Sequence, residues 1–208
     1  MWGTAGGIFL VCTANICRSV YGSAILADAL SGTSITVGSA GVETVEGQET
    51  CPVVRGLVSV EGLPQPPQLT TGSRELVVEE LAEAALILTF TVRQRGLVAR
   101  LDPSTRDRLF TLREASTLAA AIRGRRLDPG GLPAWAHALH SNRPILSTLA
   151  PPPPPPRRWW QFRRPPEAPE PWDLPDAHSA PEELHAARLG EVAELCRRLG
   201  VILAGAHG

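Results

Sequence analysis

The sequence predicts an α/β fold, a three-layer sandwich with a central four-stranded parallel sheet. Residues 8–11 form a short, continuous apolar run, which is typical of a strand that helices cover on both faces. Strand-like and helix-like segments alternate up to residue 122, as they do in parallel sheets. The chain has 208 residues, 43% of them hydrophobic, which suits one globular domain. We therefore expect a single domain over residues 1–208.

The expected strands are residues 8–11, 34–37, 86–90 and 109–112. Helices are expected at residues 18–30, 51–60, 76–85, 92–101 and 113–122. In the first of them, apolar residues recur at helical spacing, and Ser31 and Gly32 end the pattern. A last helix should open at Pro181. Its expected buried face consists of Leu184, Ala187, Leu195 and Leu199.

The pattern breaks down after residue 123, where Gly130, Gly131 and Pro133 interrupt it. Residues 151–156 are an unbroken proline run, followed by Arg157, Arg158, Trp159 and Trp160. Polyproline favours an extended, solvated helix that cannot join a sheet. We therefore expect a Pro-rich insertion at about residues 124–170. It could serve as a spacer or as a docking motif for the aromatic groove of a partner.

Charge and the N-terminal segment exclude several classes of partner. The formal net charge is −1, whereas nucleic-acid binding usually requires a clustered cationic excess. The first seven residues lack a cationic region, and the apolar run after them is too short for a signal peptide or a membrane span. We expect a cytoplasmic protein with no nucleic-acid and no membrane partner.

Cys12 directly follows the first strand and precedes the first helix. At a helix N-terminus, backbone N–H groups and the helix dipole favour an anion, here a thiolate. Arg18 follows after five intervening residues, and its planar fork can grip two oxygens of a phosphate. Cys12 is therefore the predicted nucleophile. The predicted phosphate-binding residues are Thr13, Ala14, Asn15, Ile16, Cys17 and Arg18.

Two further residues support this loop, and one has an open role. Asn15 tolerates a left-handed backbone and can brace the loop through its side chain. Ser19 can donate a hydrogen bond to the Cys12 sulfur. Cys17 could form a reversible disulfide with Cys12, or it could be a small buried side chain. Such a site needs no cofactor. No metal is expected either, because His137, His140 and His185 show no ligand spacing.

The run Cys12, Asn15, Ile16, Cys17, Arg18, Ser19 resembles the active-site signature of low-molecular-weight protein tyrosine phosphatases. The likeness extends to residues 39–41, 86–89 and 112–114. It implies hydrolysis of phosphomonoesters through a phosphocysteine intermediate. The implied substrate is a phosphotyrosine protein or a small phosphomonoester. It also implies a general acid in a late loop, which is Asp176 or, alternatively, Asp173.

Some residues depart from that family's pattern. Val20 and Ala177 stand where the family usually has Pro, and residues 43–47 lack the usual pocket aromatics, for which Trp172 is the candidate substitute. Phosphoarginine phosphatases have a similar loop but carry Thr where this chain has Ile16. The bulkier, apolar Ile16 favours phosphotyrosine over phosphoarginine as the substrate. The alternatives are a phosphoarginine phosphatase and a catalytically weak or inactive member that binds phosphorylated ligands.

Overall fold

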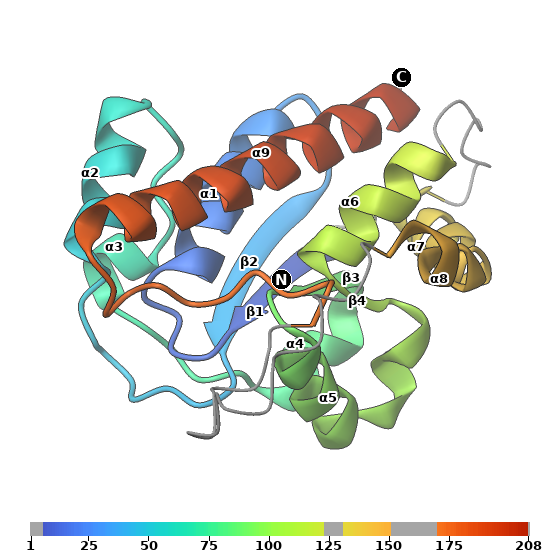
Figure 1. The fold of residues 1–208 in the computed structure, drawn as a ribbon, viewed down its shortest axis with the longest axis horizontal. Coiled ribbons are helices and arrows are strands. Elements are labelled where there is room, and N and C mark those ends of the chain that lie inside the picture. The colour runs from blue at the N-terminus through green and yellow to red at the C-terminus, as the bar shows by residue number, and fades with distance from the viewer. Residues whose placement is uncertain (1–5, 123–130, 151–169, 208) are drawn as a thin grey trace, which may run out of the picture.

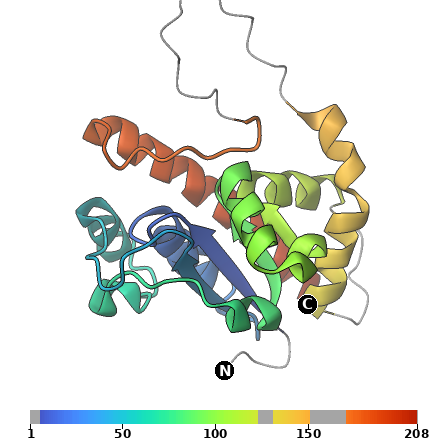
Figure 2. The ribbon, with the colours of Figure 1, turned by 90° about the horizontal axis from the view of Figure 1, so that it is seen from below.

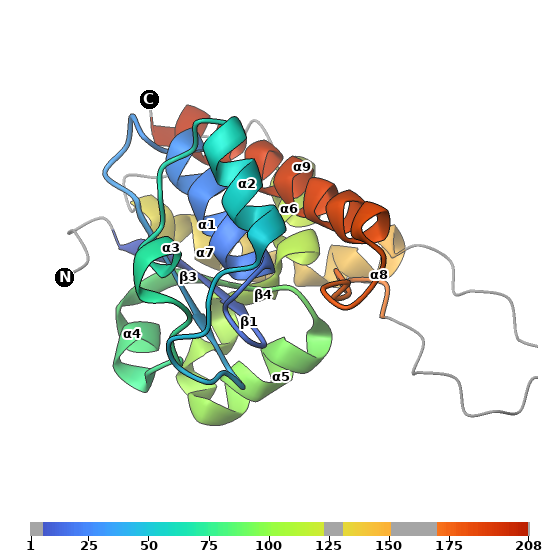
Figure 3. The ribbon, with the colours of Figure 1, turned by 90° about the vertical axis from the view of Figure 1, so that its left-hand side faces the viewer.

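The computed structural model describes residues 6–122, 131–150 and 170–207. One sheet has the strand order β2-β1-β3-β4, and every neighbouring pair is parallel. Its strands are β1 (Gly7–Cys12), β2 (Thr36–Gly41), β3 (Ala84–Thr89) and β4 (Leu109–Thr111). Helices α1, α2 and α9 lie on one side of the sheet, and α4 and α5 lie on the other (Figure 3). The predicted three-layer sandwich with a four-stranded parallel sheet is therefore confirmed.

Strand β1 lies between two neighbours and is buried along its whole length. Because side chains alternate along a strand, Ile8 and Leu10 join the apolar core on one face, and Phe9 and Val11 join the core on the other. This explains why the sequence of β1 is a continuous apolar run.

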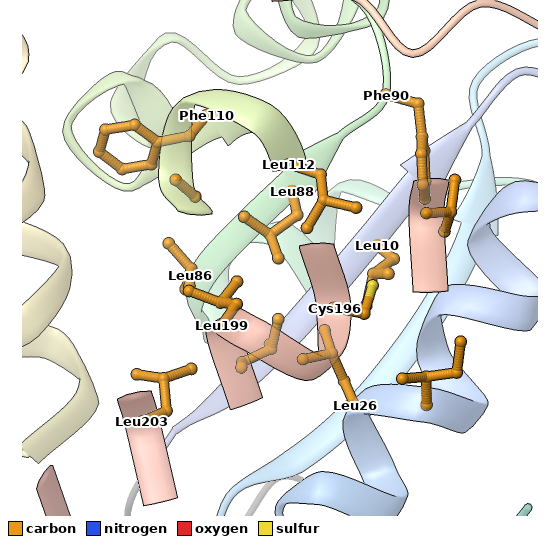
Figure 4. Packing of buried hydrophobic residues seen from close by; sticks show 14 of the residues in the cluster. Leu10, Leu26, Leu86, Leu88, Phe90, Phe110, Leu112, Cys196, Leu199 and Leu203 are labelled. Atoms are coloured by element: carbon orange, nitrogen blue, oxygen red, sulfur yellow. The ribbon is translucent and has the colours of Figure 1, made fainter. Parts of the chain in front are cut away.

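The larger core lies beneath four helices, α1 (Arg18–Ala29), α2 (Pro52–Val60), α6 (Leu112–Ala121) and α9 (Glu182–His207). From α9, Cys196 and Leu199 reach the core side chains of the sheet and α1 (Figure 4). Helices α1 and α9 approach closely at Gly200, where an added Cβ would lie 2.5 Å from the Cβ of Ala29. This packing anchors the helix that follows β1.

The smaller core is covered by α4 (Val78–Glu83) and α5 (Val92–Leu101), through Leu81 and Val98. Helix α5 has its predicted bounds, because Thr91 and Gln94 form a capping box at its start. Within residues 6–122, two short elements were not predicted, α3 (Gln68–Thr71) and the 3₁₀ helix η1 (Pro103–Asp107).

Three predicted elements need correction. The second strand starts later and continues to Gly41, because its backbone pairs with β1 as far as Cys12. The helix expected at residues 76–85 is reduced to α4, because Leu76 donates its N–H to the Gly41 carbonyl at 2.9 Å and residues 84–85 belong to β3. In α9, Leu184 and Ala187 are exposed. The buried face instead consists of His185, Leu189, Val192, Ala193, Cys196, Leu199 and Leu203.

Residues 131–150, where irregular structure was expected, form α7 (Gly131–Ser141), η2 (Arg143–Ile145) and α8 (Leu146–Leu149). Pro133 does not break α7, because proline is tolerated in a first helical turn. Leu132, Trp135 and Leu139 are buried in the larger core. This part of the expected insertion is therefore packed against the domain. The proline run at residues 151–156, with Trp159 and Trp160, lies outside the described residues.

The segment from residue 170 to 181 leads into α9 as an irregular chain, with turns at residues 171–172 and 178–179 (Figure 1, Figure 2). It is attached to the sheet where Leu174 donates its N–H to the Phe90 carbonyl at 2.7 Å, just beyond the end of β3. The segment thus passes the edge of the sheet at which the loop after β1 begins. Among the helices of the described ranges, none is long and apolar enough to cross a bilayer.

Candidate active site

The loop between β1 and α1 runs from Cys12 to Cys17 at the carboxyl end of a central strand. It packs against the end of β2, where an added Cβ on Gly41 would lie 2.6 Å from the Thr13 carbonyl oxygen. Only glycine leaves room for this approach. The strand, loop and helix predicted around Cys12 are thus present, and neighbouring strands hold the loop in place.

The Cys12 sulfur is buried and receives polar contacts from the loop itself. Its Sγ lies 3.0 Å from the Ser19 Oγ, and the Asn15 N–H donates to it at 3.2 Å. Helix α1 begins six residues later, so its N-terminal end faces the same loop. Hydrogen-bond donors and a helix N-terminus both stabilise negative charge in their neighbourhood. The expected contact between Ser19 and Cys12 is therefore present.

Asn15 is fully buried and has the left-handed backbone expected for it, with φ of 53°. Its Nδ2 donates to the Ser19 Oγ at 2.9 Å and to the Ser39 Oγ at 3.1 Å. Its Oδ1 accepts from the Arg74 N–H at 3.1 Å. One side chain thus links the loop to α1, to β2 and to the segment before α4.

Arg18 lies at the start of α1, with its side chain only 6% exposed. It donates from NH1 to the Leu174 carbonyl at 3.0 Å and from NH2 to the Asp176 Oδ2 at 2.7 Å. Its Nε is buried and has no hydrogen-bond partner within residues 6–122, 131–150 and 170–207. The guanidinium therefore retains a buried donor suited to a further oxygen.

Asp176 is brought to Arg18 across 158 positions of sequence. Partial burial raises its pKa, but the Arg18 charge and the N–H donated by His178 at 2.9 Å lower it more, so the net pKa lies below the ordinary range of Asp. Asp173 lies in a different environment. Its two oxygens accept from the backbone N–H groups of Val92, at 2.7 Å, and Glu170, at 3.2 Å.

The structure adds residues that the sequence did not indicate. Gln94 donates from Nε2 to the Thr13 Oγ1 at 2.9 Å, and its Oε1 accepts from the Phe90 and Thr91 N–H groups. Thr44 donates to the Ala14 carbonyl at 2.7 Å. A glutamine in a capping box is visible in a sequence, but its reach to a loop 81 positions away is not.

Cys17 is buried, and all four cysteines are free thiols. Its Sγ lies 3.2 Å from the His178 Nδ1. Burial raises the pKa of Cys17 far above its usual range, and neighbouring Cys51 raises it further. The structure thus agrees with one of the two predictions for Cys17, a buried side chain. The reversible disulfide with Cys12 stays a prediction.

A cysteine contacted by donors near a helix N-terminus, with an arginine close by in sequence that pairs with a carboxylate, is an arrangement suited to the chemistry of a cysteine-dependent phosphatase. The sequence model of the "Low molecular weight phosphotyrosine protein phosphatase" family matches residues 7–128. This chain belongs to that family. It is accordingly a hydrolase, a protein phosphatase that works through a phosphocysteine intermediate.

Similar proteins include a protein-arginine-phosphatase from Geobacillus stearothermophilus, which is 29% identical over 127 residues, 61% of this chain and 80% of that protein. Two solved structures share the fold. A mutant of the arginine phosphatase YwlE with a phosphorylated active-site serine has a TM-score of 0.61 at 20% identity, covering 93% of both chains. The low-molecular-weight protein tyrosine phosphatase from T. tengcongensis has a TM-score of 0.60 at 19% identity, covering 93% of this chain and 97% of its own.

Proposed function

We propose that this chain hydrolyses phosphate monoesters on tyrosine residues of proteins, with Cys12 as nucleophile and Asp176 as general acid and then base. The observation that carries this proposal is the 2.7 Å contact between Asp176 and Arg18. It brings a carboxyl group to the loop that contains the buried Cys12, where a leaving group would need a proton. Asp173 is less suited, because its oxygens accept from the backbone N–H groups of Val92 and Glu170, whereas those of Asp176 include the contact with Arg18.

In the first step, the Cys12 thiolate attacks phosphorus, and the bond from phosphorus to the phenolic oxygen breaks as the sulfur–phosphorus bond forms. Asp176 gives its proton to the departing oxygen. The backbone amides of residues 13–18 and the Arg18 guanidinium surround the equatorial oxygens, which hold the charge of the transition state. The unpartnered Nε of Arg18 supports this role.

In the second step, the Asp176 carboxylate takes a proton from water, and the water oxygen attacks phosphorus. The sulfur–phosphorus bond breaks and releases inorganic phosphate. The departing thiolate returns to the Ser19 hydroxyl and the Asn15 N–H, which lie 3.0 and 3.2 Å from the Cys12 sulfur. These donors make Cys12 a better leaving group, because they stabilise its negative charge.

Substrate binding must also protonate Asp176, whose pKa lies below the ordinary range in the free protein. The phosphate dianion competes with Asp176 for Arg18, and its own negative charge lies nearby. Both effects favour the neutral carboxyl group and raise its pKa. The ion pair of the free protein is thus replaced by a protonated acid only when phosphate is bound.

The test of the acid compares two substrates that differ in their leaving group. Asp176 acts in both steps, and the second step is common to both substrates, so the comparison uses kcat/KM, which reports only the step in which the leaving group departs. Because p-nitrophenolate leaves without much help from an acid, Asp176→Asn should reduce kcat/KM modestly with p-nitrophenyl phosphate. With phenyl phosphate the loss should approach the roughly 10²- to 10⁴-fold typical of general acid catalysis. Asp173→Asn is the matched control and should show no such dependence on the leaving group. Equal losses on both substrates would reject Asp176 as the acid.

The nucleophile is tested in the same assay. Cys12→Ser should abolish metal-free turnover, and full activity would overturn the proposal. Tight phosphate binding by the unaltered chain without vanadate-sensitive turnover would instead select the role of an inactive phospho-ligand-binding protein.

Phosphoarginine is a second candidate substrate, because the relative that is 29% identical is a protein-arginine-phosphatase. Tyrosine is favoured by Ile16, a half-buried apolar side chain within the loop. Peptides carrying phosphotyrosine or phosphoarginine should therefore differ in kcat/KM in favour of tyrosine. Ile16→Thr should shift the ratio toward arginine. A larger kcat/KM for phosphoarginine in the unaltered chain would select the second candidate.

A further inference from the structure

Two cysteines and two histidines meet beside the nucleophile loop. Cys17 belongs to the loop, Cys51 immediately precedes α2, His178 follows Asp176, and His185 lies in the first turns of α9. One ligand atom from each of the four lies within 4.8 Å of each of the others. The proposed phosphatase mechanism uses none of the four side chains.

The separations fit a tetrahedral metal site. Zinc binds thiolate sulfur at about 2.3 Å and imidazole nitrogen at about 2.0 Å, which places neighbouring ligand atoms roughly 3.3 to 3.8 Å apart. The Cys17 Sγ lies 3.2 Å from the His178 Nδ1, and the Cys51 Sγ lies 4.0 Å from the His185 Nε2. Side-chain shifts of about 1 Å would therefore complete the tetrahedron.

The cluster is held from several directions, as a structural metal site requires. Cys17, Cys51 and His185 are buried. The Cys51 N–H donates to the Ile16 carbonyl at 2.9 Å, and the His185 N–H donates to the Pro181 carbonyl at 3.0 Å. The two imidazole rings meet edge to face, with centroids 5.5 Å apart. Four separate segments thus deliver their ligands to one point.

We propose that Cys17, Cys51, His178 and His185 bind one Zn²⁺ ion in a closed tetrahedral site. Two thiolates and two imidazoles are ligands that favour zinc over magnesium or calcium. Four protein ligands leave no open position, so the ion has a structural role. On binding, the thiols of Cys17 and Cys51 release their protons to solvent.

The ion would connect the nucleophile loop to the segment that contains the candidate acid. Its ligand Cys17 precedes Arg18, and its ligand His178 donates a backbone N–H to Asp176 at 2.9 Å. Zinc would therefore hold the Asp176 segment over Arg18. The expectation of no metal rested on the spacing of His137, His140 and His185, whereas the four residues of this cluster lie far apart in the sequence.

The test uses the full chain under reducing conditions, stripped with a chelator and titrated with Co²⁺ as a spectroscopic probe. One equivalent should produce the visible absorption of tetrahedral cobalt together with a thiolate charge-transfer band, and Zn²⁺ should abolish both. The titration is repeated in Cys12→Ser, because the nucleophile is a second thiol of the same loop as Cys17. Binding should persist there. Its loss would assign the metal to Cys12 and overturn the proposal.

Ligand variants made in the Cys12→Ser background identify the site. Cys51→Ser and His185→Gln should each weaken cobalt binding strongly. The loss should exceed the roughly 10- to 100-fold that is typical when a residue only hydrogen-bonds to a metal ligand. The matched controls are Cys196→Ala, a buried cysteine outside the cluster, and His137→Gln, an exposed histidine. Both should bind like their parent.

Zn²⁺ should also raise the Tm of the parent and of both controls, because a ligand of the native state stabilises it. Zn²⁺ should leave the Tm of Cys51→Ser and His185→Gln unchanged. Without metal, these two variants should have a Tm near that of the metal-free parent, which shows that they fold. Absence of binding at one equivalent, or unchanged binding in either folded ligand variant, would refute the site. These readouts do not depend on turnover, so a failure of the proposed phosphatase activity would leave them unaffected.

Discussion

Replacing Asn15 with alanine would remove the side chain that connects the nucleophile loop to its surroundings. The amide makes three hydrogen bonds, with the Ser19 and Ser39 hydroxyls and with the Arg74 N–H. It is fully buried, so water cannot replace these partners. The residue also has φ of 53°, a conformation that alanine adopts with strain.

The magnitude follows from these contacts. Three buried hydrogen bonds contribute about 1 kcal/mol each, or about 3 kcal/mol together. The left-handed backbone costs alanine roughly 1 to 2 kcal/mol, whereas glycine avoids that strain and instead loses about 0.5 to 1 kcal/mol through its flexible unfolded state. We therefore expect Asn15→Ala to lower the free energy of unfolding by about 4 kcal/mol. Asn15→Gly should be more stable than Asn15→Ala by roughly 0.5 to 1 kcal/mol.

Urea denaturation of the two variants measures both differences. Asn142→Ala is the matched control, because Asn142 makes one side-chain hydrogen bond, to the Ala138 carbonyl, and has a negative φ. It should cost only about 1 kcal/mol. If Asn15→Ala were as stable as Asn142→Ala, the account of the network would be refuted. If Asn15→Ala were as stable as Asn15→Gly, the account of the backbone strain would be refuted.

Three further predictions concern ionisation and close packing. Tyr21 is the chain's single tyrosine, and burial followed by its 2.7 Å hydrogen bond to Glu61 raises its pKa; tyrosinate absorbance should therefore appear well above the ordinary pKa of about 10 and move down in Glu61→Gln. Gly41→Ala should lower kcat, because the new methyl group would press on the Thr13 carbonyl of the nucleophile loop. Gly56 has open space around it, so Gly56→Ala should leave kcat unchanged and increase the free energy of unfolding by about 0.5 to 1 kcal/mol. Because the pKa of Asp176 is lowered on folding, its ion pair stabilises the protein above the ordinary Asp pKa of about 3.9, and this contribution is lost as the pH falls through the folded value. Asp176→Asn should therefore make the urea midpoint less dependent on pH at the acid end.

Each of these predictions can fail in a separate way. A tyrosinate transition at the same pH in the unaltered chain and in Glu61→Gln would show that Glu61 does not act on Tyr21. Equal kcat in Gly41→Ala and Gly56→Ala would show that the loop tolerates the added methyl group. If the urea midpoint of Asp176→Asn fell with decreasing pH as steeply as that of the unaltered chain, solvent would be shown to screen the ion pair at the half-exposed Asp176 side chain.

The sequence alone determined the features that depend on neighbouring residues. The apolar run of β1, the loop from Cys12 to Arg18 and the helix after it are local, so periodicity and motif spacing predict them. The same holds for α5, whose capping box lies within four residues. The left-handed backbone of Asn15 was also predictable, because few residue types adopt it.

Only the tertiary structure decided which distant residues meet. Asp176 reaches Arg18, and Gln94 reaches Thr13, because the segment before α9 and the start of α5 both lie at the carboxyl edge of the sheet. The packing of α7 and the burial of His185 instead of Leu184 likewise depend on how whole helices pack. Such contacts form between surfaces that are distant along the chain, so no local pattern of residues records them. The cluster of Cys17, Cys51, His178 and His185 arises in the same way.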